Sequence, residues 1–453
     1  MLHIKNHIRN NNQSWREYQA KNIGRQQRGN PFVKRLKFLV SIFSLSLIVS
    51  IILLFNIDSP QNQDTSQTTE NPASGTEDSP MSKSQLFTLL SGKNLAQESN
   101  NTFKVNTGEM EYTIATSIDV ELQNYLHSLQ KRARQLNRGK PGVMAFVIMD
   151  PYTGKIIAMT GYDEDNPHIN PCLESNYPAA SIFKMVTAAA AVETLGYGPY
   201  TPLYFTGNKY TLYKRQLREI KNKKHAYRIS FSSAFAQSVN PVFGKIGKIY
   251  LGKETLDSYA TTFGFNQLIP YEQPFVSGKF EIHDDEFHLA ELGCGFNHDT
   301  TISPLFVAML TSAIINNGKA MTPSIVKQVT SFDNKVLYTH KPSIYTDAIT
   351  PKTAQIMMQL MEKTISDGTA RKSFRGSAKD KVLSKLVLGG KTGSLSNRKN
   401  TIKYDWFTGF GKEKAGEKAI VMAIVVGHQK YMGTRSTTYA HRILKRYFQK
   451  SGT

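Results

Sequence analysis

Two groups of strand-forming segments lie far apart in this sequence, and their separation is the strongest constraint on its fold. The early group is a pair of apolar runs joined by Asp150-Pro-Tyr-Thr-Gly154, a sequence typical of a β-hairpin. The late group has three apolar runs. The predicted strands are 142–150, 155–160, 386–394, 405–410 and 419–426. Two or three strands are seldom stable alone, so both groups must share one sheet of five antiparallel strands.

Helical patterns surround and separate these strands. The two early strands are apolar on both faces, which predicts that helices cover both sides of the sheet. Helices are predicted from Asp119 to about Leu136, from Ser181 through an alanine-rich run, over 351–366 and over 434–449, and 251–380 is largely helical by pattern. We therefore expect an α+β fold in which an all-helical lobe is inserted between the early and late strands.

The first part of the chain predicts a membrane anchor. Residues 38–57 contain no charge and are long enough to span a bilayer. Residues 1–37 carry nine Lys or Arg and one acid, Glu17, which places that end in the cytoplasm. A cleaved signal peptide is the alternative, but the basic region is too long and no Ala-x-Ala site follows.

The domain boundaries follow from this topology. We predict a basic cytoplasmic tail at 1–37, a transmembrane helix at 38–57, a stalk at 58–110 and a folded domain at 111–449. The folded domain then lies outside the cytoplasmic membrane. The net charge of +21 indicates an anionic neighbour, but this location excludes nucleic acid as a partner. A basic, tyrosine-rich stretch at 199–228 is interpreted as loops or a small hairpin with a solvated charge run.

The cysteine and histidine content limits which disulfides and metal sites the chain can form. The two cysteines, Cys172 and Cys294, exclude a disulfide scaffold and a four-cysteine zinc site, and whether they pair is left open. The histidines show no spacing typical of metal ligands. We expect neither a metal nor another cofactor.

Ser181-Ile-Phe-Lys184 is the first candidate for catalysis. Its spacing places both side chains on one face at the start of a buried helix, as in an activated nucleophile. The pattern alone is weak, because Ser-x-x-Lys also occurs at Ser128, Ser324 and Ser396.

Two further short motifs follow Ser181 in order along the chain. Ser238-Val-Asn240 lies at a break in a helical pattern, and Lys391-Thr-Gly393 lies on a predicted strand. The ordered set matches the three motifs of serine penicillin-binding proteins and β-lactamases. With them, 111–449 resembles the transpeptidase domain of penicillin-binding proteins, of the monofunctional, class B-like type.

Segments outside the motifs extend this resemblance. They include Thr116-Ser-Ile-Asp119, Met149-Asp-Pro-Tyr-Thr-Gly154 and Trp406-Phe-Thr-Gly-Phe410. Two positions depart from the family pattern. Ala180 stands where the family often has Gly, and Cys294 stands where it often has Gln.

Chemistry and the resemblance together assign roles to these residues. Ser181 is expected to be the nucleophile, with neutral Lys184 as its base. Ser238 would relay a proton to the leaving amine, and Asn240 would hold Lys184 and a substrate amide. Lys391 would be the second cation that lowers the pKa of Lys184.

The substrate-binding side is assigned in the same way. The resemblance implies an oxyanion hole formed by the backbone N–H groups of Ser181 and Ser394. It also implies that Lys391, Thr392 and Ser394 bind the terminal carboxylate of the peptide. Gly393 would let the substrate backbone approach the strand.

The leading hypothesis is therefore a membrane-anchored D,D-transpeptidase that cross-links peptidoglycan stem peptides and is inhibited by β-lactams. An integral-membrane glycosyltransferase is the expected polymerising partner. A D,D-carboxypeptidase or endopeptidase has the same motifs and differs only in the acceptor. A β-lactamase would need a dedicated deacylation base, and Glu174 is poorly placed for one. A β-lactam or muropeptide sensor is the non-enzymatic alternative.

Overall fold

The computed structural model describes residues 81–95, 100–283 and 285–449. They belong to one compact unit, Ser79–Thr453. The predicted cytoplasmic tail at 1–37 and anchor at 38–57 lie outside the described residues. In the part of the chain that is described, no helix has both the length and the apolar character needed to cross a bilayer.

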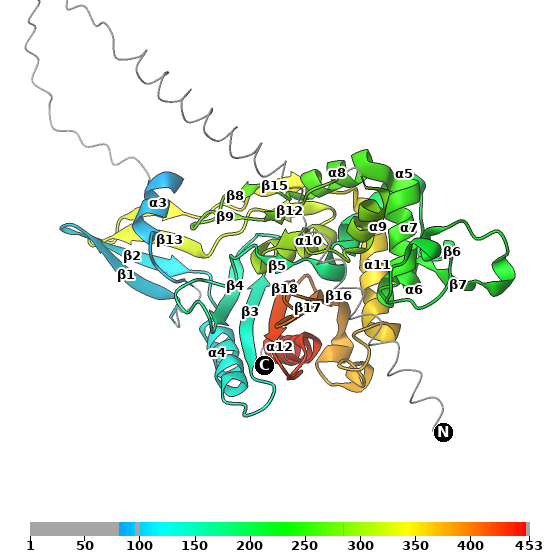
Figure 1. The fold of residues 1–453 in the computed structure, drawn as a ribbon. Helices are drawn as coiled ribbons and strands as arrows, with labels where there is room; N and C mark the ends of the chain where they lie inside the picture. The colour runs from blue at the N-terminus through cyan, green and yellow to red at the C-terminus, as the bar shows by residue number, and fades with distance from the viewer. Residues whose placement is uncertain (1–80, 96–99, 284, 450–453) are drawn as a thin grey trace, which may run out of the picture. The chain divides into compact units, whose positions relative to one another are not determined.

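A five-stranded antiparallel sheet forms the centre of this unit, as predicted (Figure 1). Its order is β16-β17-β18-β3-β4, so the late strand β18 pairs with the early strand β3, with Val425 opposite Ala145. The strands are β3 (Pro141–Met149), β4 (Ile156–Asp163), β16 (Leu386–Ser396), β17 (Lys403–Glu413) and β18 (Ala419–His428). The two distant groups therefore form one sheet, and β16 lies at its edge.

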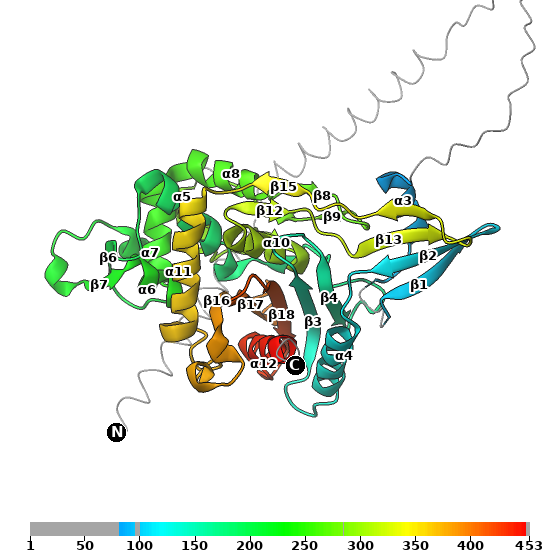
Figure 2. The ribbon, with the colours of Figure 1, turned by 180° about the vertical axis from the view of Figure 1, so that it is seen from behind.

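Helices cover both faces of the sheet, because its inner strands are apolar on both sides. On β18, Val421 and Val425 join the core cluster that includes α5 and α10, whereas Ile420 and Ile424 join the cluster that includes α4 and α12. Figures 1 and 2 show α4 and α12 on one side of the sheet and α10 on the other. The bounds are α4 (Val120–Arg134), α5 (Lys184–Leu195), α10 (Pro304–Ile315) and α12 (Ser436–Gln449).

The lobe between the early and late strands is not all helical, and that part of the prediction was wrong. Besides α5 and α10, its α-helices are α6 (Phe231–Ala236), α7 (Asn240–Lys245), α8 (Gly252–Phe263), α9 (Glu286–Cys294) and α11 (Pro351–Asp367). Its strands are β5 (Tyr177–Pro178), β6 (Pro202–Phe205), β7 (Tyr227–Ser230), β8 (Leu268–Ile269), β9 (Phe275–Val276), β10 (Gly278–Lys279), β11 (Thr301–Ile302), β12 (Lys319–Met321), β13 (Val326–Ser331), β14 (Val336–Thr339) and β15 (Ile344–Asp347). Most of these strands have two to four residues, too few to show an alternating pattern in the sequence.

A second sheet includes strands from the N-terminal part of the unit. Its order is β1-β2-β13-β14, with β1 (Thr102–Thr107) and β2 (Met110–Thr116) supplied by the chain before the central sheet. Helix α3 (Lys83–Leu90) precedes them, with Leu86 and Leu90 buried. The sequence placed the start of the folded domain near Glu111, but in the structure α3 and β1 already belong to the compact unit.

Candidate active site

Ser181 lies in a 3₁₀ turn, η1 (Ala180–Ile182), that leads into α5. The sequence placed this serine in the first turn of the helix itself, but the α-helix begins three residues later, at Lys184. Ala180 has a φ of 47°, in the left-handed region that non-glycine residues rarely adopt. Gly295 packs against this bend, since a Cβ there would lie 1.8 Å from the Ala180 carbonyl oxygen. The bend thus orients Ser181 relative to Lys184.

Lys184 is completely buried beneath Ser181. Its Nζ lies 2.8 Å from Ser181 Oγ, 2.8 Å from Asn240 Oδ1 and 2.6 Å from the Cys294 carbonyl oxygen. Burial lowers the pKa of Lys184 to about 8, because the charged ammonium loses its hydration. A substantial fraction of Lys184 is therefore neutral near physiological pH.

The surroundings of Lys184 determine what happens when it loses a proton. An ammonium can donate to all three acceptors, whereas a neutral amine keeps two N–H groups and one lone pair. Asn240 Oδ1 and the Cys294 carbonyl can only accept, so the lone pair is left facing the Ser181 hydroxyl. In the neutral state Ser181 becomes the donor to Lys184, which is the arrangement of a nucleophile and its general base.

The amide of Asn240 is held in the orientation that this arrangement needs. Its Nδ2 donates to the Tyr210 carbonyl oxygen at 3.1 Å, which leaves Oδ1 to face Lys184. Its backbone N–H donates to the Lys209 carbonyl oxygen at 2.8 Å. The loop around Lys209 and Tyr210 therefore fixes which end of the amide faces the lysine.

Ser238 and Lys391 form a second serine–lysine pair. Lys391 Nζ donates to Ser238 Oγ at 3.1 Å and to the Thr392 carbonyl oxygen at 2.7 Å. Burial, followed by the nearby charge of Lys184, lowers the pKa of Lys391 well below its ordinary value. Ser238 lies in the break between α6 and α7 and itself has a φ of 57°. At Ser181 it is the preceding residue, Ala180, that has the left-handed backbone.

The edge strand β16 places the third motif beside Ser181. Thr392 lies opposite Phe407 and Ser394 lies opposite Asp405 of β17, and the Thr392 carbonyl oxygen accepts from Lys391 Nζ. Thr392 Oγ1 lies 2.5 Å from Thr369 Oγ1. A Cβ on Gly393 would lie 3.2 Å from Ile182 Cγ1. These contacts associate Gly393 with close packing of β16 on η1, where the sequence had associated it with substrate approach.

Gln216 is a buried residue of the site region that sequence reasoning missed. Its Oε1 accepts from the Tyr213 backbone N–H and the Thr211 hydroxyl, at 2.9 Å and 3.1 Å. Its Nε2 donates to the Thr206 and Asn208 carbonyl oxygens, each at 3.0 Å. Gln216 thus holds together the loop that carries Lys209 and Tyr210. No motif in the sequence indicates this role, because three of the four partners are backbone groups.

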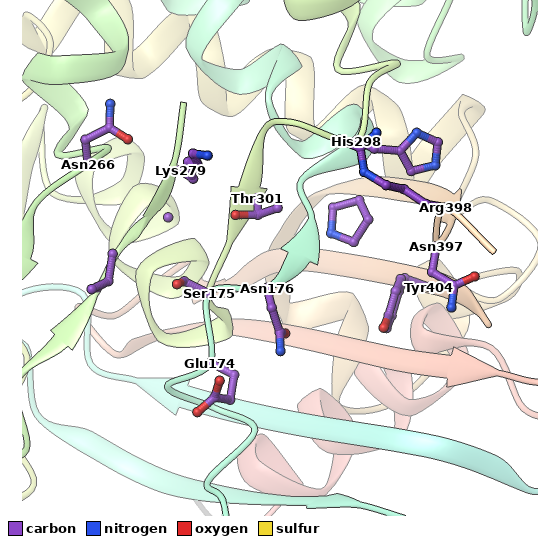
Figure 3. Close-up of a pocket in the computed structure, with 13 residues that line it drawn as sticks. Glu174, Ser175, Asn176, Asn266, Lys279, His298, Thr301, Asn397, Arg398 and Tyr404 are labelled. Carbon is purple, nitrogen blue, oxygen red and sulfur yellow. The ribbon is translucent and has the colours of Figure 1, made fainter. Parts of the chain in front are cut away.

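A cavity of about 710 Å³ adjoins the far end of β16 (Figure 3). None of the predicted catalytic or substrate-binding residues lines it. Asn397, Arg398 and Tyr404 line one side, and Ser175, Asn176 and Thr301 are also part of the lining. His298 Nε2 donates to the Ser396 carbonyl oxygen at 2.9 Å, and Arg398 pairs with Asp299. These contacts tie the loop after α9 to the end of the strand that carries the third motif.

Glu174 also lines this cavity, and burial raises its pKa.

Both cysteines are free and buried. Cys294 contributes its carbonyl oxygen to Lys184 rather than a side chain to the reaction. Over the described ranges of the chain, no three His, Cys, Asp or Glu side chains are grouped to hold a metal ion.

Comparison with known proteins identifies the class to which this fold and site belong. Residues 144–446 match the family profile described as the penicillin binding protein transpeptidase domain. The chain belongs to this family. The resemblance inferred from the three motifs is thereby confirmed.

The curated relatives are distant and longer. Stage V sporulation protein D of Bacillus subtilis is 22% identical over 330 residues, which are 70% of this chain and 49% of that protein. Peptidoglycan D,D-transpeptidase PbpA of Mycolicibacterium smegmatis is 23% identical over 324 residues, 64% of this chain and 63% of that protein. The chain therefore spans 49% to 63% of the length of these two relatives.

Solved structures share the fold. The D,D-transpeptidase domain of a peptidoglycan glycosyltransferase from Eggerthella lenta has a TM-score of 0.60 and 22% identity, covering 75% of this chain and 83% of that one. PBPA from Mycobacterium tuberculosis has a TM-score of 0.59 and 20% identity, covering 75% and 81%. The mixed α/β penicillin-binding fold is thus the fold of this unit.

Proposed function

We propose that this protein is a serine D,D-transpeptidase that cross-links peptidoglycan stem peptides through an acyl-enzyme on Ser181. The observation that carries the proposal is the set of contacts around buried Lys184. Of the three hydrogen-bond partners that Lys184 has in the described part of the chain, Ser181 alone offers a hydroxyl, and a pKa of about 8 makes the neutral base accessible.

Acylation then proceeds with each proton accounted for. Neutral Lys184 takes the proton of Ser181 as Oγ attacks the carbonyl carbon of the penultimate D-alanine. The negative charge that develops on the carbonyl oxygen is stabilised by the backbone N–H groups of Ser181 and Ser394. As the peptide bond breaks, Ser238 donates its proton to the leaving D-alanine amine and takes up the proton that Lys184 removed from Ser181, so that Lys184 is neutral again. An amine of a second stem peptide then attacks the ester, and the same groups work in reverse.

The third motif supplies recognition of the terminal carboxylate. Lys391, Thr392 and Ser394 lie on the edge strand, where a peptide can add alongside β16. The Thr369 hydroxyl, 2.5 Å from Thr392 Oγ1, orients that threonine. Gly393 keeps β16 close to the turn that carries Ser181.

The names of the relatives support this proposal. Several are named peptidoglycan D,D-transpeptidases, and PBPA from Mycobacterium tuberculosis has been solved as ceftriaxone and penicillin G acyl-enzyme complexes. We extend both properties to this chain, so that β-lactams would acylate Ser181 and inhibit it.

The same proposal includes the cellular arrangement. Residues 38–57 anchor the chain in the cytoplasmic membrane, with 1–37 inside the cell and the transpeptidase domain outside. A membrane glycosyltransferase would supply the glycan strands that this enzyme cross-links. The apolar run and the basic residues before it support this topology.

The first experiment follows the intact mass of the full chain in mild detergent after addition of benzylpenicillin, beside a Ser181→Ala variant. A stable adduct in the wild type alone is the expected result. Rapid turnover of the drug would instead indicate a β-lactamase, and absence of an adduct would contradict the proposal. Stem-peptide substrate with and without an amine acceptor then separates a transpeptidase from a D,D-carboxypeptidase.

A further inference from the structure

Residues 199–230 form a projecting segment beside the catalytic motifs, which we call the arm. Strands β6 and β7 pair antiparallel at its base, from Pro202 opposite Ser230 to Phe205 opposite Tyr227. The chain between them carries two short 3₁₀ turns, Lys214–Leu217 and Lys223–His225. Figures 1 and 2 both show β6, β7 and their connecting loop extending beyond α6 and α7.

The arm is strongly basic. It contains eight Lys or Arg and a single acid, Glu219. The exposed cations are Lys214, Arg215, Arg218, Lys221, Lys223, Lys224 and Arg228. Among the described residues, none of them is paired with a carboxylate, in contrast to lysines elsewhere such as Lys104, which pairs with Glu111. The positive charge of the arm is therefore available to an external anion.

Exposed aromatic rings lie among these charges. Tyr200 is 86% exposed and Tyr227 is 63% exposed. Tyr204 and Tyr213 are half-buried, and cations of the arm lie over them: Lys223 Nζ is 4.9 Å from the Tyr204 ring centroid and the Arg215 guanidinium is 5.4 Å from that of Tyr213. Tyrosine offers an apolar face and a polar tip at low entropic cost, which suits contact with the flat C–H faces of sugar rings. A polymer that offers phosphate groups alone would make no use of the exposed rings of Tyr200 and Tyr227.

The arm is also joined directly to the catalytic machinery. The carbonyl oxygens of Lys209 and Tyr210 accept both hydrogen bonds that hold Asn240. Lys209 Nζ lies 3.2 Å from Gln237 Oε1, next to Ser238. The arm therefore begins at the residues that hold Asn240, so a ligand bound along it lies next to the catalytic motifs.

We propose that the arm binds the peptidoglycan strand itself, with its cations facing stem-peptide carboxylates and its tyrosines facing the glycan. This inference rests on the proposed function for the identity of the polymer. The arm would concentrate polymeric substrate at Ser181 and would have little effect on small β-lactams, which need only the catalytic motifs.

The test compares two triple variants of the full chain that remove the same charge. The arm variant is Lys221→Gln, Lys223→Gln and Lys224→Gln. The control is Lys319→Gln, Lys327→Gln and Lys341→Gln, three exposed lysines on or beside β12, β13 and β14. Binding to purified peptidoglycan, freed of attached phosphate polymers, is measured by co-sedimentation at low and high salt. Acylation by benzylpenicillin reports whether each variant is folded.

The arm variant is expected to bind peptidoglycan about tenfold more weakly at low salt, because each exposed ion pair contributes a modest factor. The difference should shrink at high salt, while acylation and the control variant stay unchanged. Equal binding by the two variants, or no binding by the wild type, would overturn the proposal. So would a loss confined to phosphate polymers or to vesicles of anionic lipid. Arm-dependent binding without acylation of Ser181 would refute the proposed reaction but leave this inference standing.

Discussion

The site contains two serine–lysine pairs that are built in opposite ways. Ser181 and Lys184 are three residues apart, and the turn η1 with the start of α5 is enough to bring them to 2.8 Å. Ser238 and Lys391 are separated by 153 positions, and a helix end must meet an edge strand to bring them to 3.1 Å. The geometry of the local pair depends on one turn of the chain, whereas that of the assembled pair depends on how the lobe packs on the sheet. We infer that the first performs the nucleophilic step and the second transfers the proton to the leaving group.

The largest effect is expected from removing the base of the local pair. Lys184→Met should slow acylation by benzylpenicillin about 1,000-fold, since general-base catalysis typically contributes about 10²–10⁴-fold. Lys245→Met is the matched control, because Lys245 is also a buried helical lysine, with a pKa lowered by burial. Time courses of intact mass give both rates. A loss of less than tenfold in Lys184→Met, or an equal loss in the control, would remove Lys184 from the base role.

The pH dependence of acylation separates the two pairs. Only neutral Lys184 can accept the proton, and its pKa is about 8, so the rate should rise tenfold per pH unit below 8 and then level off. At pH 6 acylation should therefore be about 100-fold slower than on the plateau. Ser238→Ala should lower the plateau but leave the inflection in place. An inflection that shifts by a full unit in Ser238→Ala would show that the two pairs titrate as one unit.

Gln216 is expected to affect acylation through the orientation of Asn240, which lies two residues after Ser238 and accepts a hydrogen bond from Lys184. Gln216→Ala should slow acylation about tenfold, because the loop that carries Lys209 and Tyr210 loses four hydrogen bonds. Gln123→Ala is the control: Gln123 is also buried and bonds both backbone groups of Met159, but it lies on α4. It should lower stability without slowing acylation.

A double-mutant cycle distinguishes positioning from general destabilisation. In an Asn240→Ala background, Gln216→Ala should have almost no further effect on the acylation rate, because its target is gone. Additive losses at both positions would mean that Gln216 acts only on stability, and the link between loop and catalytic amide would be abandoned.

The contrast between the pairs also explains what could be predicted from the sequence. The strands of the central sheet are long and apolar, so their number, approximate bounds and antiparallel pairing were predictable. The Ser181–Lys184 contact was predictable because it depends on spacing along one turn. The contact between Ser238 and Lys391 was not predicted, although the resemblance assigned both residues to one site, because nothing local specifies a contact across 153 positions.

Elements that depend on distant backbone partners were not predictable. Strand β13 pairs with β2 across more than 200 positions, Val326 opposite Thr116, and the register shifts within the pair. A pattern search cannot detect such pairing in short strands, and the region was therefore predicted as helix. The role of Gln216 was not predicted for the same reason. Its hydrogen bonds go mainly to backbone groups, and only the fold determines where those groups lie.

The smallest effect concerns the bend that orients the local pair. Ala180→Gly should relieve the cost of a left-handed alanine, about 1–2 kcal/mol. It should lose about 0.8 kcal/mol through the buried methyl group and about 0.4–1 kcal/mol through the freer unfolded chain. The free energy of unfolding should then change by less than about 1 kcal/mol, with acylation unchanged.

Ala189→Gly provides the comparison, because Ala189 is buried within α5 and has ordinary helical geometry. There the helix-propensity loss of about 1 kcal/mol adds to the lost methyl burial of about 0.8 kcal/mol, and nothing offsets them. Urea titrations of the two variants should therefore differ clearly in midpoint, with Ala180→Gly the more stable. Equal midpoints would mean that the bend before Ser181 carries no strain, and the positive φ would then be a relaxed consequence of packing against Gly295.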